Sequence, residues 1–219
     1  MVTELSNLAT VAEPRSAAAE AYRTLRANLQ FAFLERPLRS LLVTSAGAEE
    51  DRSAVSANLA ATIAQGGQRV VLVDCDLRQP RLHTLLGLSN ERGLSSLALG
   101  DAEPYLQSTG LANLQLLAAG PLPANPLDVL LSGPVQAALA ELREKFDVLV
   151  CDAPPVLAVA DAAMLARGMD GVVLVFRAGR SKRDQAGKAR ALLAKAGANV
   201  LGAVLTNAKV DASFKGYYG

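Results

Sequence analysis

The strongest constraint on the fold is a series of short apolar runs that are hydrophobic at consecutive rather than alternating positions. Six of these runs have the length of a β-strand, at residues 41–44, 69–73, 114–117, 148–151, 172–176 and 200–205. Consecutive Val and Leu residues are typical of strands that are covered on both faces, as in a parallel sheet between helices. The sequence therefore predicts a mostly parallel sheet at the centre of the fold.

Helical patterns fill the intervals between these runs, at residues 16–35, 53–65, 134–145, 161–167 and 181–196. In the last of them, Ser181 and Asp184 predict a capping pair at the start, and Gly197 predicts the end. Alternating strands and helices give right-handed crossovers and a doubly wound sheet, whose ligands lie beyond the carboxyl ends of the strands. We therefore expect one α/β domain with its functional site at that edge.

Composition and charge exclude several classes of protein. The chain has 219 residues, of which 51% are hydrophobic and 20% charged, and this suits a globular domain. A formal net charge of +1 provides no basic field for nucleic acid, and the single histidine, His83, argues against a zinc site. Cys75 and Cys151 lie far apart, and neither a secretory signal nor eighteen consecutive apolar residues occur. We therefore expect a reducing, cytoplasmic location, with membrane contact only through a partner.

Carboxylates stand at the ends of two predicted strands. The segment VLVDCDLR places Asp74 and Asp76 one residue apart, and VLVCDAPP places Asp152 before two prolines. Residues i and i+2 face the same way, so the first two acids can converge on one cation, and Asp152 can hold Mg²⁺ beside a nucleotide phosphate. An isolated Asp after a strand often only caps a loop. Three acids at two strand ends favour a metal site.

The turn after the first strand, VTSAGAEEDRSAVSANLA, stands where a P-loop would have glycines followed by Lys and then Ser or Thr. Ala46 and Gly47 leave room at its start, and Ser53 is in place to bind a metal. However, Asp51 replaces the last glycine, and Arg52 replaces the lysine. Asp adopts left-handed backbone conformations better than most residues, so the turn can still form.

The charges of this loop are unusual for a phosphate site. Glu49, Glu50 and Asp51 place three acids where a triphosphate would lie. At near-contact distance, each like charge costs about 1–4 kcal/mol before screening. Arg52 keeps the positive charge of the lysine but has a planar fork and a different reach. Taken alone, this segment would not be identified as a P-loop.

A second charged cluster precedes the last predicted helix. It consists of Arg177, Arg180, Lys182 and Arg183. The dipole of a helix disfavours cations at its start. The sequence leaves open whether these side chains form a solvated patch or contact an anionic partner or subunit.

Six segments occur in one order along the chain: EAYRTLRANLQF, LLVTSAG, VLVDCDLRQPRLHTLLGLSNERGLS, LLAAGPLPANPLDVL, FDVLVCDAPPVLAVADA and VFRAGRSKRDQ. Together they resemble the bacterial tyrosine kinases of capsule and exopolysaccharide synthesis. The resemblance implies a P-loop NTPase fold of the deviant Walker A, MinD/ParA-like type, with ATP and Mg²⁺ as cofactors. It also implies a kinase domain at residues 16–206, between an N-terminal extension (1–15) and a flexible, tyrosine-bearing tail (207–219).

The resemblance assigns roles to individual residues. Asp74 would accept the proton of the acceptor tyrosine, and Arg52 would stand in place of the phosphate-binding lysine, so that the catalytic set is Asp74, Asp76 and Arg52. Mg²⁺ would be held by Ser53, Asp76 and Asp152. The nucleotide would contact Gly47, Ala48, Glu49, Glu50, Asp51, Arg52, Ser53, Ala54 and, near the adenine, Asn207 or its neighbour Thr206.

Two further features bear on assembly and on the substrate. Glu20, Arg23 and Arg26 lie on one flank of the first long helix, where their spacing alone fits a self-paired, solvated face. The resemblance instead implies that this flank packs subunits into a homo-oligomeric ring. The tail FKGYYG carries Tyr217 and Tyr218, which by resemblance would be the phosphoacceptors offered to a neighbouring subunit.

These observations lead to a main hypothesis and two alternatives. The main hypothesis is an ATP- and Mg²⁺-dependent protein-tyrosine autokinase that regulates exopolysaccharide or capsule polymerisation and export. It would act at the inner face of the membrane through a transmembrane polysaccharide co-polymerase. The loop GAEEDRS motivates the first alternative, a catalytically impaired pseudokinase that serves as an oligomeric scaffold for the co-polymerase. A partition or septum-positioning ATPase is less favoured, because such proteins carry an extra lysine where Gly47 stands.

Overall fold

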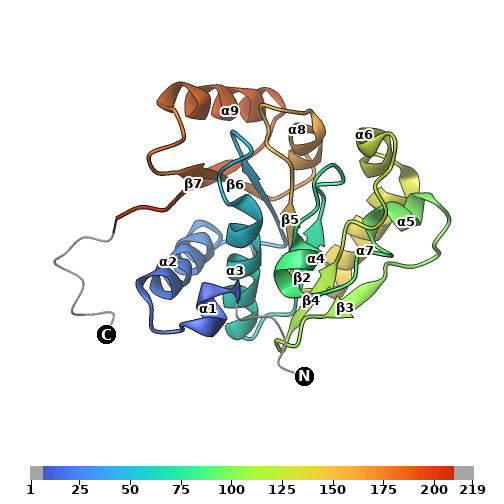
Figure 1. Ribbon diagram of the computed structural model, residues 1–219, viewed down its shortest axis with the longest axis horizontal. Coiled ribbons are helices and arrows are strands. Elements are labelled where there is room, and N and C mark those ends of the chain that lie inside the picture. Colours follow the sequence, from blue (N-terminus) through green and yellow to red (C-terminus); the bar gives the residue numbers. More distant parts are fainter. Residues whose placement is uncertain (1–6, 210–219) are drawn as a thin grey trace.

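The computed structural model describes residues 7–209. Its centre is a seven-stranded sheet with the order β3-β4-β2-β5-β1-β6-β7 (Figure 1). Six strands are parallel: β1 (Ser40–Ser45), β2 (Val70–Asp74), β4 (Leu114–Leu117), β5 (Val148–Asp152), β6 (Gly171–Arg177) and β7 (Val200–Thr206). Each of them matches a predicted strand to within one residue at either end. The predicted doubly wound, mostly parallel sheet is therefore confirmed.

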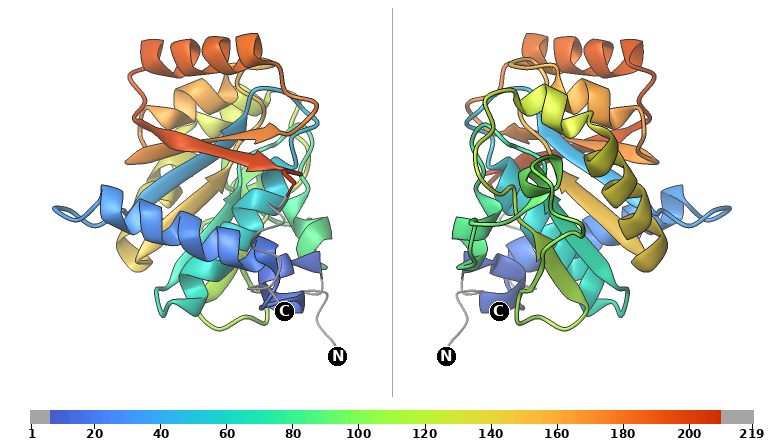
Figure 2. Two further views of the ribbon diagram at one scale, coloured as in Figure 1. Left: turned by 90° about the vertical axis from the view of Figure 1, so that its left-hand side faces the viewer. Right: turned by 90° about the vertical axis from the view of Figure 1, so that its right-hand side faces the viewer.

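Helices cover both faces of this sheet (Figure 2). One face carries α1 (Ala9–Ala12), α2 (Ala17–Ala32), α3 (Arg52–Gln65) and α4 (Leu82–Leu86). The other carries α5 (Leu94–Ala98), α6 (Pro126–Leu130), α7 (Gly133–Lys145), α8 (Asp161–Ala166) and α9 (Arg183–Lys195). Within residues 7–209, none of the helices combines the length and the hydropathy needed to cross a membrane.

The central strands are buried at every position because both of their faces are covered. In β1, Leu41 and Val43 pack into the core beneath α3, whereas Leu42 packs into the core on the opposite face. Side chains alternate between the faces of a strand, so two-sided burial requires apolar residues at consecutive positions. This explains the pattern from which the strands were predicted.

The elements missing from the prediction are short or half-exposed. Strand β3 (Leu106–Ser108) is a three-residue antiparallel edge strand, and α1, α4, α5 and α6 span only four or five residues each. Such segments are too short for a clear hydrophobic period. The first long helix also ends at Ala32, three residues before the predicted position.

The capping pair predicted for the last helix is wrong, although its predicted end is confirmed. Helix α9 begins at Arg183 with Lys182 as its N-cap, and Asp184 pairs with Lys188 at 2.7 Å. The Ser181 hydroxyl instead donates to Glu50 in the loop after β1. Gly197 follows the helix with a φ of 75°, a conformation that glycine adopts without strain.

Part of the expected N-terminal extension belongs to the core. Leu8 and Thr10 are buried, and both the backbone amide and the hydroxyl of Thr10 donate to Asn58 Oδ1 of α3 at 3.1 Å. Helix α1 therefore fixes α3 from the side opposite the sheet. Since α3 begins directly after the loop that follows β1, this packing helps to position that loop.

Two glycines provide a matched test of the packing. A Cβ on Gly93 would overlap the backbone of Ala118 and Gly120, whereas Gly187 lies exposed within α9 with nothing within 4 Å of such an atom. We expect Gly93→Ala to lower the free energy of unfolding by about 2 kcal/mol or more, because a close backbone contact is overpacked. Gly187→Ala should raise it by roughly 0.5–1 kcal/mol, because alanine is the better helix former. Urea denaturation measures both changes, and an equal effect of the two substitutions would contradict this account.

Candidate functional site

The carboxyl ends of β1, β2 and β5 are adjacent, and the predicted acids meet there. The parallel register places Asp74 of β2 directly opposite Asp152 of β5, and Asp76 follows in the loop between β2 and α4. All three side chains are buried. The sheet topology thus brings acids from distant segments into one cluster.

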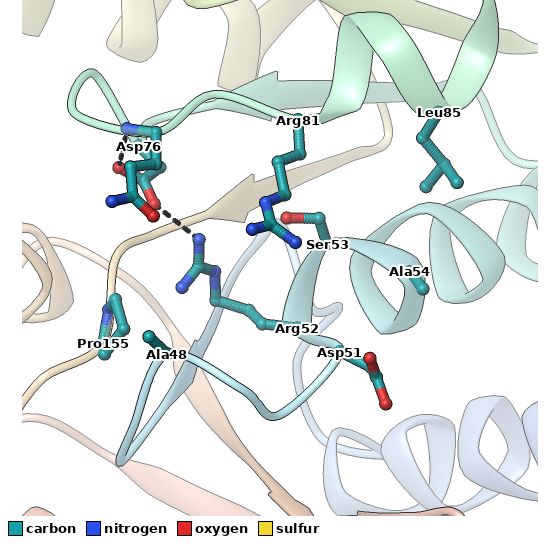
Figure 3. A pocket seen from close by; sticks show the side chains of 10 residues that line it. Ala48, Asp51, Arg52, Ser53, Ala54, Asp76, Arg81, Leu85 and Pro155 are labelled. Atoms are coloured by element: carbon teal, nitrogen blue, oxygen red, sulfur yellow. Dashed lines mark hydrogen bonds and ion pairs between the residues drawn. The ribbon is translucent and has the colours of Figure 1, made fainter.

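A single arginine lies at the centre of this cluster. Arg52, the first residue of α3, places Nε 3.1 Å from Asp152 Oδ1. Its Nη2 lies 2.5 Å from Asp76 Oδ2, a contact drawn in Figure 3. Only 8% of its side chain is exposed. The guanidinium is therefore bound between two buried carboxylates.

Hydroxyl groups complete the surroundings of Asp152. Ser53 Oγ donates to Asp152 Oδ2 at 2.6 Å, and Ser56 Oγ donates to Oδ1 at 2.9 Å. Burial raises the pKa of the Asp152 carboxyl, while the charge of Arg52 and the two hydroxyls act in the opposite direction. Ser53, which was expected to bind a metal, is therefore hydrogen-bonded to a carboxylate.

Asp74 lies beneath the cluster and holds the loop between β2 and α4. Its Oδ2 accepts the amides of Arg81 and Leu82 at 3.1 and 3.0 Å, and its Oδ1 accepts the amide of Asp76 at 3.2 Å. Burial, followed by the charge of Asp152, raises the pKa of the Asp74 carboxyl to about 8.

The loop after β1 closes on one of its own carboxylates. Asp51 adopts the left-handed conformation with a φ of 55°, so the expectation that the turn forms despite its missing glycine is confirmed. Glu50 is buried, and its Oε2 accepts the amide of Gly47 at 2.8 Å. In a P-loop such amides point towards phosphate oxygens. Here one of them is satisfied by the protein itself.

Residues of the turn between β6 and α9 offset the charges of the three loop acids. We call Glu49 to Asp51 the acidic loop and Arg177 to Ser181 the basic turn. Arg180 Nη1 lies 2.6 Å from Glu49 Oε2, and Arg177 Nη1 lies 3.3 Å from Asp51 Oδ2. Glu50 accepts the hydroxyl of Ser181. The like-charge repulsion expected from the sequence is thus offset within the chain, and two members of the basic cluster, Arg177 and Arg180, contact acids.

A small cavity of about 160 Å³ opens beside Arg52. Figure 3 shows Arg81, at the start of α4, directed towards it above Ser53. The cavity is lined by Ala48, Asp51, Arg52, Ser53, Ala54, Asp76, Gln79, Arg81, Leu85 and Pro155. Sequence reasoning did not select Gln79 and Arg81, although both closely follow Asp76 in the segment DLRQPR.

The remaining predicted residues lie elsewhere. Asn207 lines a different cavity, between α2 and β7, together with Thr206. On α2, Glu20 pairs with Arg23 at 2.8 Å, as the self-paired alternative expects, and Arg26 donates to the Thr62 carbonyl of α3 at 2.9 Å. Tyr217 and Tyr218 lie outside the described residues.

The fold implies a magnesium ion, and its expected ligands lie within this cluster. The oxygens of Ser53, Asp76 and Asp152 are of the type that Mg²⁺ prefers. However, the Arg52 guanidinium lies between the two carboxylates. Across residues 7–209, no group of three or more His, Cys, Asp or Glu side chains is arranged to hold a metal. In this arrangement the site does not fit a divalent cation.

Comparison with known proteins identifies the family. A ParA family model, described as NUBPL iron-transfer P-loop NTPase, matches residues 39–212. Tyrosine-protein kinase YwqD of Bacillus subtilis is 39% identical over 216 residues, which cover 97% of this chain and 91% of the relative. The putative tyrosine-protein kinase CapB of Staphylococcus aureus is 37% identical over 94% and 92% of the two chains. The kinase domain of Escherichia coli tyrosine kinase ETK superposes with a TM-score of 0.86 at 34% identity, covering 93% of this chain and 82% of the ETK domain.

The chain therefore belongs to the bacterial tyrosine-protein kinases, a family with the ParA-like P-loop fold, and carries a degenerate Walker A loop.

Proposed function

We propose that this chain is a catalytically impaired member of its family that regulates capsule or exopolysaccharide export as an oligomeric scaffold. The observation that carries the proposal is that side chains of the chain itself satisfy the charges of the nucleotide site. Arg52 is bound by Asp76 and Asp152, and Glu50 accepts the amide of Gly47. Each of these contacts uses a group that Mg²⁺·ATP would otherwise need.

The buried contacts oppose nucleotide binding more strongly than the exposed ones. Removing Arg52 from the two buried carboxylates costs about 3–5 kcal/mol when nothing replaces it, so Mg²⁺ would have to take over as their counter-ion. The pair between Glu49 and Arg180 is exposed, and such a pair contributes about 0.2–1 kcal/mol. A triphosphate that opened the acidic loop would still meet three carboxylates, each repelling it by about 1–4 kcal/mol before screening.

In this proposal the binding partners are proteins. The chain would assemble as a ring of identical copies through the α2 flank, where the side chains of Glu20 and Arg23 are 50% and 39% exposed. It would act at the inner face of the membrane, bound to a transmembrane polysaccharide co-polymerase. Support for this partner comes from similarity to tyrosine-protein kinases such as CapB, and not from a surface that identifies the co-polymerase.

A second candidate is an active tyrosine kinase that uses ATP and Mg²⁺. It is favoured by the presence of Asp74, Asp76, Asp152 and Ser53 within one cluster. If Arg52 moved out of the cluster, Ser53, Asp76 and Asp152 could hold the metal. The metal would supply charge neutralisation at the phosphates. Asp74 would then accept the proton of a tail tyrosine, either Tyr217 or Tyr218.

A titration with Mg²⁺·ATP separates the two candidates. Binding of Mg²⁺·ATP to the wild-type protein should not saturate below about 1 mM, because the Arg52 guanidinium and the Gly47 amide are already bound by carboxylates of the chain. A variant with the loop restored by Glu49→Gly, Glu50→Ala, Asp51→Gly and Arg52→Lys should bind at least about tenfold more tightly. Arg52→Lys alone is the control and should remain weak, since the three acids stay in place. Micromolar binding by the wild type in calorimetry would contradict the proposal.

Phosphotyrosine formation is the second measurement. With Mg²⁺·ATP and the cytoplasmic segment of the co-polymerase, wild-type protein should show no phosphotyrosine at Tyr217 or Tyr218 by mass spectrometry. The expected reason is that Arg52 does not leave Asp76 and Asp152 to engage a phosphate. Phosphorylation that requires Mg²⁺ and disappears in Asp74→Asn would instead establish the kinase candidate.

A further inference from the structure

Arg52 occupies the position in which the metal-binding residues expected from the sequence would hold Mg²⁺. We infer that Arg52 is a covalently attached replacement for that divalent cation, so that a side chain of the protein neutralises the carboxylates of Asp76 and Asp152. The inference deepens the proposed function, because it names what holds the site together without a metal. Its test uses no nucleotide.

The contacts of Arg52 are those required of a bridging cation. Its Nη2 lies 2.5 Å from Asp76 Oδ2, and its Nε lies 3.1 Å from Asp152 Oδ1. The side chains of these acids are 4% and 0% exposed, so neither charge is neutralised by solvent. Ser53 Oγ lies 2.6 Å from Asp152 Oδ2, which places the third expected metal ligand on the same carboxylate.

The planar fork of arginine explains why this residue can take the role. A guanidinium presents N–H donors in different directions and can bind two carboxylates at once, whereas the ammonium of lysine is a compact point charge on a flexible stem. Arg52 thereby links the start of α3 to the loop after β2 and to the end of β5. A bridging Mg²⁺ would link the same three segments through oxygen ligands.

A tethered cation differs from a free one in its response to solution conditions. Mg²⁺ can dissociate, whereas Arg52 remains at the site at any metal concentration. A free ion would also have to expel a buried guanidinium before it could reach the same oxygens. We therefore expect the site of the wild-type protein to be indifferent to Mg²⁺.

Replacing Arg52 should uncover the metal site. Arg52→Met keeps a long side chain but removes the charge, so that the carboxylates of Asp76 and Asp152, with the hydroxyl of Ser53 beside them, lose their counter-ion. With Mn²⁺ as the probe, electron paramagnetic resonance of the unbound ion should show one Mn²⁺ bound per chain in Arg52→Met, at least about tenfold more tightly than in wild type. Millimolar Mg²⁺ should raise the melting temperature of Arg52→Met and leave that of the wild type unchanged.

Two controls test whether the effect is specific to this cluster. Arg180→Met removes an arginine from an exposed pair with Glu49 and should create no Mn²⁺ site. Adding Asp152→Asn to Arg52→Met should abolish the binding that the single substitution created. Binding of Mn²⁺ by wild type as tightly as by Arg52→Met, or no binding by Arg52→Met, would overturn the inference.

The test remains decisive if Arg52→Met does not fold under standard conditions. Refolding of the variant with and without millimolar Mg²⁺ then replaces the binding measurement. Recovery only with the ion supports the inference, and failure in both conditions overturns it. Binding of Mg²⁺·ATP by the wild type would refute the scaffold proposal but would not change the Mn²⁺-binding result, which is measured without nucleotide. Failure of the scaffold proposal and failure of the Arg52 inference are therefore distinguishable.

Discussion

The buried cluster of Arg52, Asp76 and Asp152 is the interaction on which the arrangement of the site depends. It joins the start of α3, the loop after β2 and the end of β5 at the edge where the parallel strands terminate. Buried charges are stable only when they are paired, and removing one partner leaves the others uncompensated. The three segments are therefore coupled, and a change in one of these side chains affects the position of the other two segments.

The second set of charges, between the acidic loop and the basic turn, has a different physical character. The Glu49–Arg180 pair is largely exposed, and the Asp51–Arg177 pair is about half-exposed, so solvent screens both. Only Glu50, buried against Gly47 and Ser181, fixes the loop firmly. The exposed pairs can therefore break without disturbing the Arg52 cluster. A bound triphosphate would have to displace both the buried contacts of Glu50 and those of Arg52.

Much of the fold, but less of the site, could be predicted from the sequence. Strands such as β1 were found because burial on both faces imposes consecutive apolar residues, whereas the half-exposed edge strand β3 carries no such signal. The meeting of Asp74 with Asp152 followed from parallel topology. The direction of the Arg52 side chain could not be predicted in this way, because it depends on which charged neighbours lie within reach once the chain has folded. The partners of Glu49 and Glu50 lie 131 positions away, a separation that no local pattern reveals.

The geometry also changes what the presence of the acids means. A P-loop protein that retains Asp76, Asp152 and Ser53 invites the conclusion that it retains catalysis, since these residues would organise Mg²⁺. In this chain the same residues have a structural task, because Arg52 is buried and requires both carboxylates as counter-ions. Ser53 and Ser56 in turn supply hydrogen bonds to the most deeply buried of them. The acids would be needed here even if no nucleotide ever entered the site, so their presence alone does not distinguish a kinase from a scaffold.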